Sequence, residues 1–249
     1  MASIVQAHLG GNSSQTVGPS STVTTCTSTY PSPTTSGNLL IACCFYTIDQ
    51  ATGISLPSRS VTFTDSGGNT WSNSVNGGGY TTASTERAAS MFLLGNCPVV
   101  SSNTLTFSLT LGATSASTYA VKMETVLFEV AGCVASTNYS GHGPLVDNSK
   151  GAASTTSTPT VSGLVLASND VVFFTYIGNS GNVGAGAGYT LGPSTTVAVT
   201  GQVEYNLNVT AGTVSAAYAA TQAQWGGSAI GFIQAAAATA TSSYGFFFG

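Results

Sequence analysis

The stretch YAVKMETVLFEVAG, from Tyr119 to Gly132, is the longest strand-like run in the chain and decides the fold. Apolar and polar residues alternate in each half of this run, which is typical of a β-strand. The apolar phase shifts by one residue near Thr125, and such a shift predicts a β-bulge in a central strand. The same alternation places Glu124 and Glu129 on solvent or interface faces of that strand.

Shorter strand-like runs separated by glycine-rich turns fill the chain on both sides of this stretch. Sustained helical periodicity is almost absent. Short strands at regular spacing predict an all-β fold, an antiparallel β-sandwich or jelly roll. The predicted strands lie at 39–47, 60–65, 70–72, 88–94, 104–111, 119–132, 171–177, 189–191, 203–209, 213–219 and 228–235.

The second half of the chain repeats the pattern of the first. Gly37-Asn38 precedes the apolar run LLIACCFYT, and Asn169-Asp170 precedes the similar run VVFFTYI. The later strand-like runs then follow in the same order. This pattern predicts two pseudo-repeated halves, 37–132 and 160–235, which supply strands to the sandwich.

Both ends of the chain differ from the repeated pattern. Residues 1–35 predict an N-terminal edge strand and an extended arm, ahead of a sandwich domain at 36–235. Residues 236–249 form a tail with three consecutive phenylalanines, which soluble proteins do not leave in water as an exposed patch. We expect this tail to dock on the chain's own sheet or on a neighbouring subunit, through Tyr244, Phe246, Phe247 and Phe248.

Charged residues make up only 5% of the chain, against roughly 25% in an ordinary globular domain. The four cations are scattered, so no basic stripe is available to bind nucleic acid or a membrane surface. No run reaches the roughly 20 apolar residues of a membrane-spanning helix. With so few ionisable groups, we also expect stability to depend weakly on pH and salt.

The cysteines are odd in number and lack CxxC spacing, which predicts free, buried thiols rather than disulfides or a zinc site. They are Cys26, Cys43, Cys44, Cys97 and Cys133. The N-terminus MASIVQAHLGG has neither the basic region nor the long apolar core of a secretory signal. We therefore expect an uncleaved product in the cytoplasm.

Few residues offer catalytic chemistry. His142 lies near Asp147 in a glycine loop, but no GxSxG motif is present and such a loop positions a general base poorly. The carboxylates are too dispersed along the chain to indicate a glycosidase pair. The run Asp65–Asn69 lacks the spacing of a calcium loop, and Gly184–Gly188 is a loop rather than a dinucleotide fingerprint. We predict no enzyme activity, no catalytic residue, no metal site and no cofactor.

Trp71 and Trp225 are candidate platforms for a glycan, because β-sandwiches often bind sugars on exposed aromatic rings. Trp71 closes a predicted hairpin, and Trp225 precedes two glycines. Packing in the core is the alternative interpretation for each ring.

Several motifs together resemble a loose β-sandwich family of bacteriophage virion proteins and bacterial surface or secreted proteins. They are GNLLIACCF (37–45), VTFTDSGGNTWS (61–72), ETVLFEVAG (124–132), GPLVD (143–147), NDVVFF (169–174) and AGYTLG (187–192). These motifs describe strands and turns, so no catalytic residue carries over from the family.

The resemblance implies a non-enzymatic structural protein of a bacteriophage virion, either a capsid decoration (cement) protein or a tail or fibre component. Its partners are then copies of itself, with a trimer as the expected oligomer, and other virion proteins on a shell. Assembly would take place in the host cytoplasm. The alternative hypothesis is a glycan-binding module at the cell surface or outside the cell.

Overall fold

The protein is built from β-strands. The computed structural model describes residues 1–18, 20–50, 57–75, 79–82, 85–113, 118–134, 151–167, 169–178, 184–194, 200–219 and 222–235. Within these residues every regular element is a strand, and every pair of strands is antiparallel, so the predicted all-β sandwich architecture is confirmed. The strands are β1 (Ser3–Val17), β2 (Thr22–Ser28), β3 (Leu39–Gln50), β4 (Arg59–Asp65), β5 (Ser72–Val75), β6 (Gly79–Thr81), β7 (Thr85–Leu94), β8 (Leu105–Leu111), β9 (Tyr119–Ala131), β10 (Gly151–Ser157), β11 (Thr160–Leu166), β12 (Val171–Gly178), β13 (Thr190–Leu191), β14 (Gly201–Asn206), β15 (Gly212–Ala217) and β16 (Gln222–Phe232).

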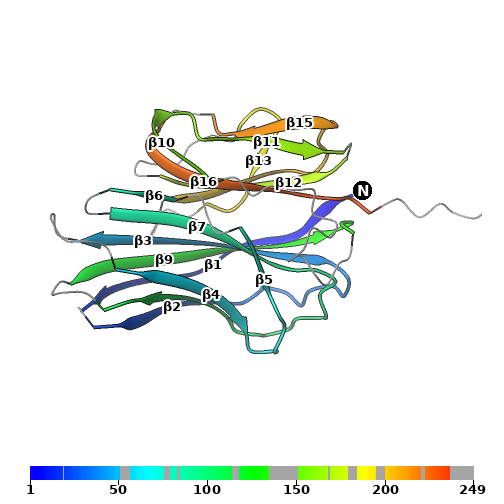
Figure 1. Cartoon of the computed structure of the whole chain (residues 1–249). Helices are drawn as coiled ribbons and strands as arrows, with labels where there is room; N and C mark the ends of the chain where they lie inside the picture. Colours follow the sequence, from blue (N-terminus) through cyan, green and yellow to red (C-terminus); the bar gives the residue numbers. More distant parts are fainter. Residues whose placement is uncertain are drawn as a thin grey trace, which may run out of the picture.

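The strands form four sheets that are stacked as layers (Figure 1). Outer sheet 1 has the order β2-β8-β4, and inner sheet 1 has the order β1-β9-β3-β7-β5, with β6 also paired to β7. Inner sheet 2 has the order β10-β16-β12-β14-β13, and outer sheet 2 is the pair β11-β15. The chain is therefore two sandwiches packed back to back through their inner sheets.

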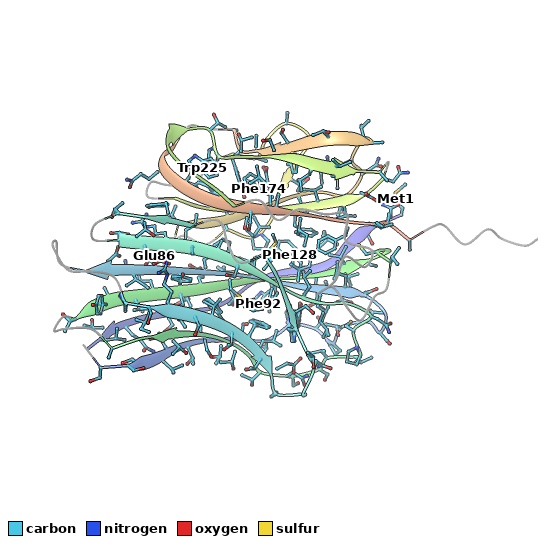
Figure 2. The ribbon with its side chains drawn as sticks, viewed as in Figure 1. Met1, Glu86, Phe92, Phe128, Phe174 and Trp225 are labelled. Carbon is cyan, nitrogen blue, oxygen red and sulfur yellow. The ribbon has the colours of Figure 1, made fainter. Side chains whose placement is uncertain are left out.

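Three hydrophobic cores separate the four layers (Figure 2). Phe92 lies in the core of the first sandwich, and Phe174 and Trp225 lie in the core of the second. Phe128 lies in the middle core between the inner sheets, with its ring 5.1 Å from that of Phe173. Because the middle core buries large apolar side chains from both inner sheets, the two sandwiches pack against each other.

The two halves of the chain share one topology. The inner sheets have equivalent strand orders: β1-β9-β3-β7-β5 in inner sheet 1 corresponds, position by position, to β10-β16-β12-β14-β13 in inner sheet 2. In the outer sheets, β2-β8 corresponds to β11-β15. Among the described residues, β4 and the short β6 have no counterpart. The structural repeat runs from β1 to β9 and from β10 to β16, so each half is longer than the predicted 37–132 and 160–235.

The turns that precede β3 and β12 show the same equivalence in their hydrogen bonds. Gly37-Asn38 exchanges two backbone bonds with Cys97, of 2.9 and 3.0 Å, and Asn169-Asp170 exchanges two with Val209, of 2.9 and 3.0 Å. These matched turns align the two halves residue by residue.

The inner sheets face each other with their strand orders reversed. β9 lies against β14, where Phe128 and Tyr205 have ring centroids 5.9 Å apart, and β7 lies against β12 and β16. Since β9 and β16 are equivalent strands, as are β7 and β14, the two sandwiches meet as the subunits of a two-fold dimer do.

The first 35 residues contribute a strand to each sheet of the first sandwich. β1 is an edge strand of inner sheet 1, as predicted. The predicted extended arm is wrong for residues 22–28, which form β2 and pair with β8 along their whole length. Thr24, Cys26 and Ser28 point inward and the residues between them are exposed or half-buried. The Ser/Thr-rich composition suggested an extended arm, yet threonine is also a good strand former.

The predicted bulge in β9 is wrong. Its pairing with β3 runs without a register shift over its whole length. One face of β9 is buried in the first half, whereas both faces are buried from Glu124 to Val130. Inner sheet 2 covers the second half, where Val126 and Phe128 enter the middle core. The phase shift near Thr125 therefore reports the change from one covered face to two.

The irregularity lies in the neighbouring strand β1. Gly10 and Gly11 together lie opposite Thr125, which shifts the register between β1 and β9. The Gly11 backbone N–H donates to Thr125 Oγ1 at 3.1 Å. A Cβ on Gly11 would overlap the carbonyl oxygen of Thr27 in β2, and a Cβ on Gly10 would overlap Thr125 Oγ1. Glycine at both positions therefore allows β1 to bulge while β2 packs directly against it.

We expect Gly11→Ala to destabilise the protein by about 1–3 kcal/mol, because the methyl group must displace backbone in β2. Urea unfolding measures the effect. Gly18→Ala is the matched control, since no atom lies within 4 Å of a Cβ at that position. Equal stability of the two variants would contradict the packing described for the bulge.

Candidate functional site

The two tryptophans considered as glycan platforms lie in the hydrophobic cores. Trp71 is 8% exposed, packs edge-on against Phe63 at 4.8 Å, and donates from Nε1 to Asp65 Oδ2 at 3.4 Å. Trp225 is 2% exposed and lies in the core of the second sandwich. Core packing, the alternative interpretation, describes both rings, and neither offers an open face to a sugar. The residues of other site predictions lie outside the described part of the chain: His142, Asp147, Tyr244, Phe246, Phe247 and Phe248.

Asp65 organises the turn that superficially resembles a calcium loop. Its Oδ1 accepts hydrogen bonds from the Gly67 backbone N–H at 2.6 Å and from Asn103 Nδ2 at 2.7 Å. Its Oδ2 accepts from Asn69 Nδ2 at 2.7 Å as well as from Trp71. Turn chemistry therefore explains this carboxylate, as predicted.

Glu124 and Glu129 do not lie on solvent faces, and this prediction is wrong. Both side chains are fully buried within the single chain. Glu129 accepts hydrogen bonds from Asn38 Nδ2 and Gln6 Nε2, each at 2.6 Å, and from the Thr35 backbone N–H at 2.7 Å. The carboxylate ties β1 and the segment before β3 to β9, where three donors make its burial favourable.

Two more carboxylates hold parts of the protein's own structure. Glu86 Oε1 forms an ion pair with Arg59 and accepts a hydrogen bond from the Tyr46 hydroxyl at 2.7 Å. Asp170 Oδ2 accepts from the Ala167 backbone N–H at 2.9 Å. Burial, together with the charge of Glu86, raises the pKa of Tyr46 above its ordinary value, so this hydroxyl stays protonated and donating.

The cysteines are all buried and free, as predicted. Burial raises the pKa of the Cys26 and Cys133 thiols to about 12, which leaves them protonated and unreactive at neutral pH. Among the described residues, no three His, Cys, Asp or Glu side chains come together as metal ligands would.

Arg87 forms part of a polar row on inner sheet 1. It pairs across the sheet with Thr47 on β3 and Tyr80 on β6. Its guanidinium lies 5.9 Å from the centre of the Tyr80 ring and donates to the Gly178 carbonyl at 2.5 Å. Thr47 Oγ1 and Arg87 Nε are buried and have no hydrogen-bond partner among the described residues. Through Gly178 this row links the two sandwiches.

The repeat departs from its own pattern at Glu204. When the two halves are aligned by their matched turns, Glu204 is equivalent to Phe92 of the first half. Glu204 pairs with Phe174 across inner sheet 2, and Phe92 pairs with Ala42 across inner sheet 1. Phe92 is a core residue that stacks on Phe63 of β4 at 5.2 Å. In the second half a carboxyl group replaces that aromatic ring, and the described residues include no strand equivalent to β4.

The Glu204 carboxyl is fully buried and only partly hydrogen-bonded. Its Oε2 accepts from the Gly186 backbone N–H at 2.8 Å, while Oε1 is buried and has no hydrogen-bond partner among the described residues. Burial raises the pKa of Glu204 to about 7, and the bond from Gly186 offsets only part of that rise. The nearby Tyr189 hydroxyl is also buried, with no partner in the part of the chain that the structure describes. Its pKa is raised to about 12 by burial and by the charge of Glu204.

The second sandwich contains no cation to neutralise Glu204. From residue 151 to the end of the sequence the charged residues are Asp170 and Glu204, with no lysine, arginine or histidine. A buried carboxylate without a counter-ion is costly, and the usual outcome is that it takes up a proton. Glu204 is therefore the candidate functional group of this structure: a carboxyl group that changes charge near neutral pH.

Sequence patterns missed this group because its surroundings come from a distant segment. In VEYNLNV the apolar residues Val203 and Tyr205 face the middle core, so alternation places Glu204 on the opposite, apparently exposed face. The segment that contains Gly186 covers that face. The alignment of the repeat was the available signal, since it sets Glu204 against Phe92.

Known proteins give no guide to this site. The chain matches no family model, no curated protein and no solved structure. In the part of the chain that the structure describes, no helix is long and apolar enough to cross a membrane.

We expect Glu129→Ala to destabilise the protein by roughly 2–4 kcal/mol, because it leaves three donors without their acceptor. Chemical denaturation measures the loss. Glu129→Gln is the control: it keeps the shape and one acceptor oxygen, so a smaller loss is expected. A Glu129→Ala variant as stable as the wild type would show that these bonds do not hold the N-terminal strands.

Proposed function

We propose that the chain is a non-enzymatic structural protein that associates with copies of itself and with a larger assembly. The observation that carries this proposal concerns four of the chain's few carboxylates. Each of them accepts hydrogen bonds from the protein's own turns, strands or side chains. They are Asp65, Glu86, Glu129 and Asp170. Catalysis requires an acid, base or nucleophile directed at a substrate, and these groups are directed at the fold.

The edge strand β1 supports association through a sheet edge. It runs for 15 residues and pairs with β9 on one side. Its sequence SIVQAHLGGNSSQTV contains no lysine, arginine, acid or proline, which are the residues that usually block pairing at an edge. Val5 on this strand is 49% exposed. Pairing of β1 with another chain would extend inner sheet 1 by main-chain hydrogen bonds.

Within this class of protein, we propose a component of a bacteriophage virion, either a capsid decoration protein or a tail or fibre component. The support is the resemblance of the strand and turn motifs, together with a surface of hydroxyl and amide groups that suits docking on a shell. The glycan-binding alternative has weaker support, because Trp71 and Trp225 are buried.

The test is the mass of the purified protein in solution, measured by light scattering. We expect a stable oligomer for the full chain and a monomer after deletion of residues 244–249, which removes the aromatic cluster. A full-length variant with serine at Tyr244, Phe246, Phe247 and Phe248 controls for the change in length, and it should also be monomeric. A monomeric full-length wild-type protein would overturn self-association.

A further inference from the structure

The segment Gly184–Leu191 takes the place of β4 in the second sandwich. It follows β12 and precedes β14, as β4 follows β3 and precedes β7. It lies over Glu204 and against the end of β15, where a Cβ on Gly186 would overlap the Ala217 carbonyl oxygen. A regular strand therefore covers the core of the first sandwich at this place, and an irregular glycine-rich segment covers the core of the second.

Within the described residues, few contacts hold this segment. Its described backbone bonds are Ala219 N–H to the Gly184 carbonyl at 2.9 Å and, within the segment, Tyr189 N–H to the Gly186 carbonyl at 3.0 Å. β13, at its end, pairs with β14 at only two positions. The Gly186 N–H···Glu204 bond is the described side-chain tie between the segment and the sheet beneath it. Segments with few such contacts open at low free-energy cost.

The groups that face Glu204 do not stabilise its charge. The described tyrosines on this side of inner sheet 2 are Tyr189 from the segment, Tyr218 after β15 and Tyr176 on β12, and none of them carries a positive charge. β11 and β16 contribute only uncharged residues there, including Val161, Leu164, Trp225 and Ala229. An ionised Glu204 would thus remain buried with one bonded oxygen and no cation, a state that favours exposure to water.

We propose that Glu204 is a proton-controlled latch for the segment Gly184–Leu191. With a neutral carboxyl group the segment stays closed over the core of the second sandwich. Once the carboxyl group is ionised, the segment opens and water reaches the carboxylate. This inference does not depend on self-association or on a virion role.

The direction of the pH effect follows from proton linkage. The pKa of Glu204 is about 7 in the closed state, and the open state has the ordinary value of 4.5. Between these pH values the closed state binds more protons than the open state. The free-energy preference for the closed state is therefore largest below pH 4.5 and declines as the pH rises to about 7. Above pH 7 the free-energy preference for the closed state no longer changes with pH and stays at its lowest value. This one group is an exception to the weak pH dependence that the composition predicts.

Amide hydrogen exchange tests the latch in the full-length protein. We expect the protection factors of the Gly186, Tyr189 and Ala219 amides to fall by about tenfold or more from pH 5 to pH 7.5. Protection factors, rather than raw rates, remove the intrinsic pH dependence of exchange. The amides of Ile41 and Phe173 in the inner sheets serve as internal references and should keep their protection.

Two variants distinguish the effect of the Glu204 carboxyl group from the effect of the neighbouring hydroxyl. Glu204→Gln cannot ionise, so the protection of the segment should become independent of pH. Tyr189→Phe removes the neighbouring hydroxyl and should keep the wild-type pH dependence. An unchanged pH dependence in Glu204→Gln would overturn the proposal, as would a parallel loss of protection at Ile41 and Phe173 in the wild type.

A direct titration of the wild type needs no variant. The carboxyl carbon of Glu204, followed by ¹³C NMR, should titrate with a midpoint near 7. A midpoint near 4.5, the ordinary value, would also overturn the latch.

Discussion

The whole structure depends on the burial of both faces of inner sheet 1. Successive residues of β3 enter different cores: Leu40 and Cys44 pack toward outer sheet 1, while Ile41 and Phe45 pack toward inner sheet 2. An unbroken apolar run is the only pattern that satisfies both neighbours, since a polar residue at any of these positions would lose its hydration without gaining a partner. Much of β7 and the second half of β9 are also buried on both faces, and a polar residue there, such as Glu129, is held by donors from the chain itself. The burial of both faces also explains how a chain with so few charges still specifies one arrangement of its layers.

Burial then gives two glutamates opposite properties. Glu129 meets three donors and serves as a structural tie. Glu204 meets one donor in a sandwich without cations, which makes its charge costly. Donors and counter-ions, rather than depth, distinguish the two groups, because both are fully buried. The poorly compensated carboxyl group therefore lies where the second sandwich has Glu204 in place of an aromatic core residue and has no described strand equivalent to β4.

The fold class, most of the apolar strands and the repeat follow from alternation, apolar runs and turn residues, which are local properties of the sequence. The polar strands β2 and β10, and also β11, were not predicted. The number of layers does not follow from local properties, because it depends on which strands of one half face the other. For that reason the phase shift near Thr125 suggested a bulge, although the irregular residues are Gly10 and Gly11 in another strand. The candidate site was hidden for the same reason: Glu204 looks exposed by alternation, and only the segment around Gly186 buries it.

The back-to-back contact of the two sandwiches has a consequence for how the protein tolerates dilution. In a dimer of separate chains, the contact between inner sheets would come apart at low concentration. Here the chain between β9 and β10 joins the two halves, and such a connection acts like a partner held at a local concentration on the order of millimolar. The middle core therefore persists however dilute the protein becomes. The two halves are also free to differ, which two identical subunits cannot do, and Glu204 lies where they differ.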